Sequence, residues 1–533
     1  MPTARFAVAL LVSLANVAAQ DVDEAAVEFF RNQGLEPDHS RVMEHLSWIC
    51  DVHGPRLTGS PNMRRAQDWA IATLGEWGLQ NAKKEKWGPF GRGWRCDRAG
   101  MRVVGDNPWP VLAYAKAWSP SLGRVTAEVV NVYAMDADTL RNADLTGKVV
   151  LTEPPRAVSE PFDGVSRRFD SEDLLVMADQ RADAGRSRQR RSAEASRTNF
   201  RTGFQRRGQM LEILATKNPL AMIDRGYKGD YGTVFVGGAR AMPGPDGGRT
   251  SARAVGAKVV PQFTIAVEHY NRMCRLLDKG FPVHVELDLE TTFFDEDLYD
   301  YNVVAEIPGS DPELGSQVVM MGAHLDSWHT GTGSTDNGSG SAVAMEAARL
   351  IARYVQESGV KPRRTVRVAL WSGEEQGLLG SRAYVREHYG ETGKPNEEHA
   401  QISGYFNLDN GTGRIRGVYL QGNEAIAATF RSWLRPFHDI GATTLTLNNT
   451  GGTDHLAFSR VGIPGFQFIQ DPVSYSTRTH HSNMDVWDHA VADDLRQAST
   501  IMAAFVWHTA QRDELLPRMP LPEPVEASAR RGR

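Results

Sequence analysis

The chain has 533 residues, more than a single hydrophobic core usually supports, so two or three domains are expected. Hydrophobic residues make up 41% and charged residues 23%, which is ordinary for a folded globular protein. The formal net charge of −5 leaves no electrostatic footprint for nucleic acid, so no nucleic-acid partner is expected.

The first 19 residues are predicted to be a signal peptide. Arg5 precedes an apolar run from Phe6 to Leu14, and Val17-Ala18-Ala19 fits a small-residue cleavage site. The run is too short to span a bilayer, and the acidic sequence that starts at Asp21 argues against a buried helix. We therefore expect residues 1–19 to direct export to a periplasm or the cell exterior. No later segment is predicted to span a membrane.

Residues 20–122 are the expected N-terminal part of the main domain. The sequence reads as helical from Val22 to about Glu85, with apolar residues at helical spacing between Val42 and Val52. A dense turn signal between Gly54 and Pro61 interrupts this helical pattern.

The three cysteines are Cys50, Cys96 and Cys274. Export permits a disulfide, and Cys50 with Cys96 is the favoured pair because both lie in the N-terminal segment. Three buried free thiols fit the sequence equally well. Since no Cys-x-x-Cys motif occurs, a thiolate zinc site is not expected.

Residues 123–285 are expected to form a second, inserted domain that is rich in β-strands. Short β-type segments are predicted at 125–132, 148–152, 233–236 and 259–265. A stretch rich in Arg, Ser and Ala, residues 181–207, interrupts this region. Because the flanks of this stretch lack interleaved aromatic residues, a solvated helix or mobile insert explains it better than a surface for nucleic acid or another anion.

Strands and helices alternate between residues 286 and 515, the expected catalytic domain. Strands are predicted at 318–322, 365–371 and 402–408, and helices at 341–354 and 378–388. This order predicts an α/β fold with a mixed, mostly parallel sheet flanked by helices, and ligand sites beyond the carboxyl ends of its strands. Residues 516–533 contain four prolines and are expected to be a disordered tail.

Histidines and acidic residues cluster where these strands end. In chain order they are His324, Asp326, Asp336, Glu374, Glu375, Asp409, His481 and Asp485. Two imidazoles and several carboxylates in such loops suit two divalent cations that share a bridging carboxylate and activate a water. Placing Glu374 beside Glu375 after an apolar strand is costly unless cations neutralise them.

Each motif alone also has an ordinary structural explanation. Asp336 fits an Asx-turn or a helix N-cap, and the two adjacent glutamates fit the acidic first turn of a helix. Asp326 could orient His324 directly or through the backbone, and Asp485 is expected to orient His481. The joint order of the motifs, rather than any one of them, therefore carries the prediction.

Together the motifs resemble the M28 family of zinc exopeptidases. The resemblance covers residues 322–485 and extends to Gly54–Ser60, which is similar to the N-terminal signature of that family. Three motifs look most like the plasma glutamate carboxypeptidase branch, whose members are aminopeptidases or dipeptidases: His324–Trp328, Glu374–Gly377 and His480–Ser482. Residues 123–285 resemble the protease-associated (PA) domain often inserted there. The implied fold is that of zinc peptidases of the phosphorylase/hydrolase type with an inserted PA domain.

The resemblance also implies two Zn²⁺ ions and a role for each motif residue. The implied roles are one metal on His324 and Asp409, the other on Glu375 and His481, Asp336 as the bridge, Glu374 as general base, Asp326 as a second catalytic residue, and Asp485 behind the ligands. A cis peptide between Asp336 and Asn337 is implied as well. The tyrosine that helps the oxyanion in many members is missing near Thr453–His455, which leaves Tyr475 as a candidate.

These features predict an exported dizinc exopeptidase that hydrolyses short peptides, as an aminopeptidase or dipeptidase. The sequence leaves the oligomeric state open. Three alternatives remain: a glutamate-type carboxypeptidase, a single-zinc glutaminyl cyclase, and a non-catalytic binding ectodomain of the same fold. A carboxypeptidase would need a cation near the metals, for which the candidates are Arg414, Arg416 and Arg478. The filled ligand positions favour the dizinc enzyme.

Overall fold

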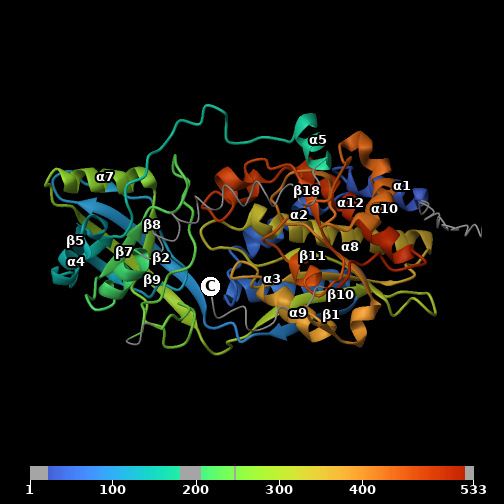
Figure 1. Cartoon of the computed structure of the whole chain (residues 1–533), viewed down its shortest axis with the longest axis horizontal. Coiled ribbons are helices and arrows are strands. Elements are labelled where there is room, and N and C mark those ends of the chain that lie inside the picture. Colours follow the sequence, from blue (N-terminus) through green and yellow to red (C-terminus); the bar gives the residue numbers. More distant parts are fainter. Residues whose placement is uncertain (1–21, 180–205, 245–247, 522–533) are drawn as a thin grey trace, which may run out of the picture.

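The computed structural model describes residues 22–179, 206–244 and 248–521. The predicted signal peptide, almost all of the Arg-rich insert and residues 522–533 lie outside the described residues. The described chain is built on two large sheets that lie side by side along the long axis of the molecule (Figure 1). Within the described ranges, no helix combines the length and the apolar character needed to cross a bilayer.

The first sheet forms the right-hand part of Figure 1 and has eight strands. Their spatial order is β1 (Gln80–Trp87), β10 (Asp300–Ile307), β12 (Thr365–Trp371), β11 (Val318–His324), β15 (Ile402–Asn407), β18 (Gly465–Gln470), β16 (Ile415–Tyr419) and β17 (Thr444–Thr446). The central strands β12, β11, β15 and β18 are parallel, whereas β1, β10 and β16 lie antiparallel to neighbours. The expected mixed α/β sheet is therefore confirmed.

Helices cover both faces of this sheet. One face is covered by α1 (Glu24–Gly34), α2 (Val42–Ser47), α8 (Ser339–Ser358) and α12 (Ala492–Gln511), and the other by α9 (Leu379–Tyr389) and α11 (His455–Ser459). The remaining helices of this part are α3 (Pro61–Glu76) and α10 (Ala427–Leu434). Because side chains alternate along a strand, Val319 and Met321 of β11 enter the core under α8, and Val318 and Met320 enter the opposite core. Both faces are apolar, so β11 reads as a continuous hydrophobic run.

The second sheet has its own core and also has eight strands. Their order is β3 (Trp109–Pro110), β2 (Gly93–Val104), β9 (His284–Phe294), β5 (Gly123–Asn131), β6 (Val149–Leu151), β7 (Ala221–Asp224), β8 (Gln262–Ile265) and β4 (Ala113–Ala115). Its helices include α4 (Ala137–Asn142) and α7 (Val267–Asp278), and residues 206–214 are helical as well. The helix α5 (Ser171–Asp179) instead contacts β17 of the first sheet. A short hairpin, β13 (Gly390–Glu391) and β14 (Lys394–Pro395), follows α9.

The second sheet reaches beyond residues 123–285 at both ends. β2 pairs with β9 along most of its length, so residues 93–104 join this sheet rather than the first one. The sequence pattern does not predict which sheet residues 93–104 join, because that depends on the long-range pairing between β2 and β9. The division of the chain into domains at residues 122 and 285 stays a prediction.

Three local expectations are wrong. Residues 80–85 belong to β1, an edge strand, rather than to a helix. Residues 233–236 form no strand of the second sheet, because Phe235 instead makes an isolated bridge to Ser482 of the first domain. The tail does not begin at Leu516, since that side chain is buried in the core and its backbone N–H donates to Ser403 Oγ at 3.2 Å.

The three cysteines are free thiols, so the disulfide between Cys50 and Cys96 does not form in this structure. Cys50 is buried beside the loop that precedes α8, where its Sγ lies 3.7 Å from the carbonyl oxygen of Gly333. Burial raises the pKa of the Cys50 thiol to about 12. Cys50 therefore behaves as a small core residue.

Candidate metal centre

The predicted ligands meet at the carboxyl ends of the central parallel strands. His324 is the last residue of β11, and Asp409 lies two residues beyond β15. Glu375 lies in the turn that follows β12, and Asp336 lies in the segment Ser334–Gly338 that leads into α8. His481 comes from the loop after β18. Parallel strands end at one edge of a sheet, which brings together residues more than 150 positions apart.

Asp336 stands between two sets of ligand atoms. Its Oδ1 is 3.3 Å from His324 Nε2, which is also 3.4 Å from Asp409 Oδ1. Its Oδ2 is 3.1 Å from His481 Nε2, which is 2.8 Å from Glu375 Oε2. Each oxygen of Asp336 therefore faces a different imidazole and a different second carboxylate. The peptide between Asp336 and Asn337 is cis, as the resemblance implies.

These residues fit metal ions by both spacing and chemistry. Two ligands at tetrahedral angles around zinc, each about 2.0–2.1 Å away, lie about 3.3 Å apart, close to the separations described above. Several buried ligand atoms have no hydrogen-bond partner among the described residues: His324 Nε2, Asp336 Oδ2, Glu375 Oε1 and Asp409 Oδ1. Buried polar atoms normally have a partner, so these converging atoms point to a missing cationic one. Imidazole and carboxylate are ordinary zinc ligands.

His480 is a second imidazole near the bridge. Its Nε2 lies 3.7 Å from Asp336 Oδ2, and its ring stacks on that of His481 with centroids 3.7 Å apart. His481 is closer to Asp336 and also contacts Glu375, so the geometry favours His481 as the ligand.

Burial and neighbouring charges shift the pKa values of the acids and imidazoles in this cluster. Although burial opposes it, the nearby imidazoles of His324 and His481 hold the pKa of Asp336 well below its usual range. Burial raises the pKa of Glu375 to about 7 and that of Glu374 well above its ordinary value. Despite burial, Glu375 and Asp336 raise the pKa of His481 to about 11. A cation bound here would displace these protons.

The carboxylate of Asp326 holds the turn that carries Glu374 and Glu375 rather than the ring of His324. His324 Nδ1 lies 2.9 Å from the backbone carbonyl oxygen of Asp326 and 3.6 Å from its carboxylate. The His324 ring is therefore oriented by the backbone of Asp326 and not by its carboxylate. The carboxylate accepts hydrogen bonds from the backbone N–H groups of Glu374 and Glu375, at 3.2 and 3.3 Å, and from Thr58 Oγ1 at 2.9 Å. Asp326 therefore fixes the turn that carries the predicted base and a predicted ligand.

Asp485 does not orient His481, contrary to the expectation. Its carboxylate accepts the backbone N–H groups of Thr335 at 2.5 Å and Asp336 at 3.1 Å. Burial and the nearby Asp336 raise the pKa of Asp485 to about 7. The residue thus positions the backbone of the bridging aspartate. The spacing His-Ser-x-x-Asp suggested the wrong partner because the chain turns away after His481, whose φ is +62°.

Arg56 is a positioning residue whose contacts the sequence did not specify. Its guanidinium is fully buried and donates to the carbonyl oxygens of Leu325 at 2.6 Å, Thr332 at 2.7 Å and Gly333 at 2.8 Å. It therefore ties the loop after His324 to the loop before the bridging aspartate. The turn-rich Gly54–Ser60 motif marks this segment in the sequence. The carbonyl oxygens that accept from Arg56 are brought to it only by the fold.

Tyr475, the oxyanion candidate, packs over the loop after Asp409. Its ring centroid lies 4.8 Å from that of His480, and a Cβ at Gly411 would come within 2.9 Å of the Tyr475 ring. Gly411 also has φ of +88°, so glycine suits this position on both grounds. Burial and the charges of Asp336 and Asp409 raise the pKa of Tyr475 well above its ordinary value. Its role stays a prediction.

The three arginines considered for a carboxypeptidase site are already paired. Their partners are Asp494 for Arg414 at 3.2 Å, Asp471 for Arg416 at 3.0 Å, and Asp230 for Arg478 at 2.5 Å. Each is therefore committed to a structural carboxylate. None of these three arginines is therefore available to bind a substrate carboxylate.

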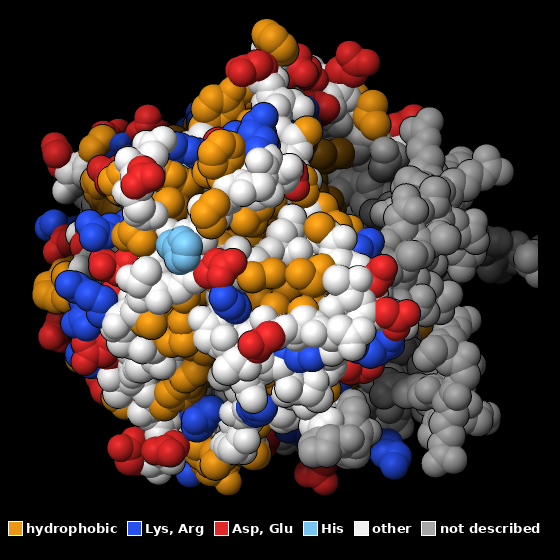
Figure 2. Space-filling model, turned by 90° about the vertical axis from the view of Figure 1, so that its left-hand side faces the viewer, with side chains coloured by type: hydrophobic (Ala, Val, Ile, Leu, Met, Phe, Trp, Pro, Cys, Tyr) orange, Lys and Arg blue, Asp and Glu red, His pale blue; other side chains and the backbone are white. Residues whose placement is uncertain are grey.

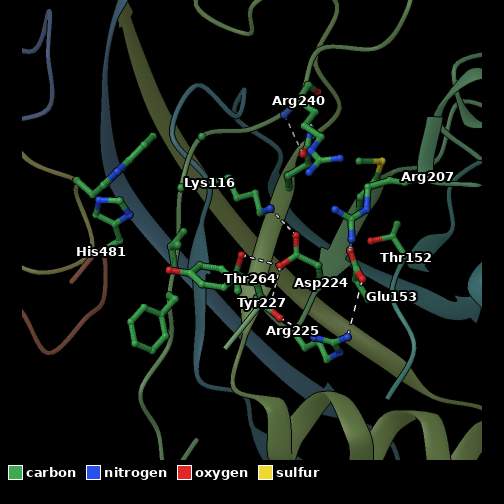
Figure 3. Close-up of a pocket in the computed structure, with 18 of the residues that line it drawn as sticks. Lys116, Thr152, Glu153, Arg207, Asp224, Arg225, Tyr227, Arg240, Thr264 and His481 are labelled. Carbon is green, nitrogen blue, oxygen red and sulfur yellow. Dashed lines mark hydrogen bonds and ion pairs between the residues drawn. The ribbon is translucent and has the colours of Figure 1, made fainter. Parts of the chain in front are cut away.

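The second domain forms a wall beside the metal centre. The backbone N–H of Val236 donates to the carbonyl oxygen of His481 at 3.0 Å, and Lys228 Nζ donates to that of Ser476 at 2.6 Å. A cavity of about 480 Å³ lies between the two domains, and Glu375 and His481 are among the residues that line it. Figure 3 shows His481 at one side of this cavity. His481 is the more exposed imidazole ligand candidate, at 29% against 1% for His324, so this end of the centre faces the cavity.

Several known proteins resemble this chain in sequence or in fold. Carboxypeptidase Q of Mus musculus is 26% identical over 485 residues, which cover 90% of this chain and 87% of that protein. The crystal structure of a peptidase M28 precursor from Shewanella amazonensis SB2B shares the fold, with a TM-score of 0.63 and 24% identity over 94% of this chain and 98% of that one. The zinc aminopeptidase BSAP from Bacillus subtilis also shares it, with a TM-score of 0.53 and 19% identity over 89% and 96% of the two chains.

The family match covers the part of the chain that carries the site. Residues 302–506 match peptidase family M28. This range contains every predicted metal ligand as well as Glu374, Asp326 and Asp485. By this match, residues 302–506 of the chain are similar to peptidase family M28.

Proposed function

We propose that the protein is a dizinc exopeptidase that hydrolyses peptide bonds in short peptides, as an aminopeptidase or dipeptidase. The observation that carries this proposal is the placement of Asp336, whose two oxygens face two separate imidazole–carboxylate pairs. One site would use His324 and Asp409, and the other Glu375 and His481. The names of related proteins, a zinc aminopeptidase and carboxypeptidase Q, support the same reaction class.

Glu374 is the proposed general base. Its Oε2 lies 3.8 Å from His324 Nε2, and Asp326 anchors its backbone, so its carboxylate stays beside the ligands without lying between them. Zinc bound at this centre would polarise the peptide carbonyl and make water more acidic. Glu374 would take a proton from the attacking water and pass it to the leaving amine.

The decisive experiment compares Glu374→Gln with Asp336→Ala. Glu374→Gln should lower kcat by about 10²–10⁴-fold, because proton transfer is lost, while two zinc ions per chain remain by elemental analysis. Asp336→Ala should lose zinc as well as activity, since both proposed sites need it. Glu357→Gln, an exposed change on α8, serves as the control. A fully active Glu374→Gln protein would overturn the assigned role.

Zinc stoichiometry and chelation separate the remaining alternatives. A glutaminyl cyclase would hold one zinc ion per chain, and a binding ectodomain would show no chelator-sensitive cleavage. Peptides blocked at the N-terminus, the C-terminus or neither would separate an aminopeptidase from a carboxypeptidase, because only an aminopeptidase needs the free α-amine.

We further propose that residues 1–19 direct export and that the region around residues 123–285 is a PA-type domain. The apolar run with its small-residue cleavage site supports the first proposal, and the separate core of the second sheet supports the other.

A further inference from the structure

A second cavity lies in the first domain, away from the metal centre. It has a volume of about 680 Å³, in the range that holds a small ligand, and it lies among α2, α3 and α8 in the right-hand part of Figure 1. None of the proposed metal ligands lines it. Whereas α8 begins at Ser339, next to the segment of the bridging aspartate, the lining residue Ala352 lies about 20 Å further along the helix axis.

Each of the three helices turns one face toward this cavity. The lining of α3 runs from Trp69 through Thr73 to Trp77, and Arg349 and Arg353 recur in the same way on α8. Residues four positions apart lie on the same face of a helix. The cavity is therefore a cleft between helix faces, and its chemistry is set by side chains on rigid elements.

Three of the 12 tryptophans of the chain gather in this cleft. The rings of Trp48 and Trp69 have centroids 6.2 Å apart and planes at 16°, so they present nearly parallel faces. Trp48 is 43% exposed, and the ring of Trp77 lies 4.9 Å from that of His45. Among the described residues, no basic side chain lies over these three indole rings and no group accepts their N–H. The cleft thus offers apolar ring faces together with free donors.

The charges of the cleft are almost balanced. Each of its arginines has an acidic partner: Arg41 has Glu44 at 3.1 Å, Arg349 has Glu346 at 2.7 Å, and Arg353 has Glu357 at 2.7 Å. Glu76 also lines the cleft, and its carboxylate has no partner among the described residues. Gln356 donates from Nε2 to the carbonyl oxygen of Trp77 at 3.1 Å, which fixes the amide. Glu76 and the Oε1 of Gln356 therefore remain available as acceptors.

This combination of groups suits a sugar. A pyranose whose hydroxyl groups are all equatorial carries axial C–H groups on both faces, and these apolar faces pack against indole rings. Its hydroxyl groups lie around the rim, where one carboxylate can accept from two neighbouring hydroxyls and an indole N–H can donate to a third. A strongly anionic ligand would find no unpaired cation in the cleft, because each arginine already has its acid.

The second domain shows no similar group of free rings over its described surface. Figure 2 shows the end face of that domain, where apolar side chains lie among Lys, Arg, Asp and Glu side chains. The partly exposed Trp109 of this domain has the guanidinium of Arg272 over its ring, 4.5 Å from the centroid, so that face is already covered. The open indole faces are therefore a feature of the cleft in the first domain.

We propose that the cleft between α2, α3 and α8 binds a short β-linked oligosaccharide, which lies along Trp48 and Trp69 and donates hydrogen bonds to Glu76. The nearly parallel ring faces favour a β-1,4-linked chain, because its sugar rings form a flat ribbon. The site is independent of the proposed peptidase chemistry. It would hold the protein on a polysaccharide while the metal centre stays open to peptides.

The test measures the binding of cellobiose to the full chain by calorimetry. The wild-type protein should bind cellobiose with a Kd on the order of 1 mM, because a small neutral ligand exchanges hydrogen bonds with water for hydrogen bonds with protein. Maltose has the same composition, but its α link bends it out of a flat ribbon, so it should bind more weakly. Trp48→Ala and Glu76→Gln should each raise the Kd for cellobiose about tenfold, through a lost ring face and a lost charged acceptor.

Trp109→Ala and Asp68→Asn are the matched controls. Asp68 lies on α3 as Glu76 does, but it pairs with Lys84 at 2.6 Å and does not line the cleft. Both controls should keep the wild-type Kd. Because Trp48 and Glu76 are exposed, their variants should also keep the wild-type circular dichroism, which separates lost binding from lost folding.

Two results with cellobiose would overturn the proposal: no binding to the wild-type protein, or wild-type affinity in both Trp48→Ala and Glu76→Gln. Tighter binding of maltose than of cellobiose would also overturn it. So would tighter binding of choline, a cation that uses aromatic faces without any array of hydroxyl groups. None of these measurements needs zinc or turnover, so their failure leaves the peptidase proposal standing, and a protein without peptidase activity can still show the sugar site.

Discussion

Asp326 shows why one carboxylate near a metal centre need not touch the metal. Both of its oxygens accept hydrogen bonds, Oδ1 from the N–H of Glu374 and Oδ2 from the N–H of Glu375 and from Thr58. Asp326 thus holds both Glu374, the proposed base, and Glu375, a proposed ligand. Substitution of a residue that holds metal ligands in place commonly lowers metal affinity or activity by about 10–100-fold.

Asp326→Asn should therefore lower kcat by about 10–100-fold while two zinc ions remain bound. The amide NH₂ introduced by this substitution would face a backbone N–H of Glu374 or Glu375, and two donors repel each other. Glu374 would therefore shift while every proposed ligand stays in place. Steady-state kinetics with zinc analysis would check this. Thr58→Val removes one donor only and should cost less. Wild-type kcat in Asp326→Asn would contradict the positioning role.

The helix α8 illustrates how an element is fixed beneath the site. Glu346, on α8, is fully buried and pairs with Arg349 at 2.7 Å and with His45 of α2 at 3.1 Å. It also accepts the N–H of Arg41 at 3.0 Å. Despite burial, these partners lower the pKa of Glu346 to about 2. The cluster locks α2 against the helix that begins just after Asp336.

This lowered pKa predicts a pH-dependent contribution to stability. Because the folded pKa lies below the ordinary value of 4.5, the stabilisation is present above about pH 4.5 and is lost as the pH falls toward 2. Glu346→Gln should lower the free energy of unfolding by about 3 kcal/mol at pH 7, and this difference should shrink between pH 4.5 and 2. Urea unfolding of both proteins across this range measures it.

The exposed Glu357→Gln, on the same helix, should show no such pH-dependent difference, because exposed ion pairs contribute little. A constant difference between Glu346→Gln and the wild type at every pH would mean that packing, and not charge, stabilises the cluster.

At the scale of the whole molecule, the second domain is fastened to the ligand loop of the first. Asn483 Oδ1 accepts the Val234 N–H at 2.7 Å, and the Asn483 N–H donates to the Val234 carbonyl at 3.2 Å. The segment that leads to α5 crosses between the domains (Figure 1), and its Arg168 pairs with the buried Asp471 at 2.9 Å and Asp494 at 2.6 Å. The two domains are thus joined at two separate places.

Asn483→Ala should loosen this attachment. It leaves the Val234 N–H without its acceptor, which costs about 1–3 kcal/mol, and it should lower kcat/KM for short peptides about tenfold, mainly through KM. Zinc content should stay at the wild-type value, because Asn483 is not a proposed ligand. Ser476→Ala, an exposed change in the same loop, is the control. Unchanged kinetics in Asn483→Ala would show that the cavity does not depend on this contact.

The sequence by itself determined the sheet that carries the site and the residues that meet there. The strand at Thr365–Trp371 was predicted with its observed bounds, and His324 and Asp409 were recognised as polar residues at strand ends. Local patterns suffice for this, because hydrophobic periodicity sets the strands and the parallel order brings their carboxyl ends to one edge.

Only the tertiary structure decided which groups support the ligands. Asp485 holds the backbone of Asp336 instead of the ring of His481, and residues 233–236 pair with the ligand loop instead of joining the second sheet. The contacts of Asp485 join positions about 150 residues apart, and those of the 233–236 segment about 250.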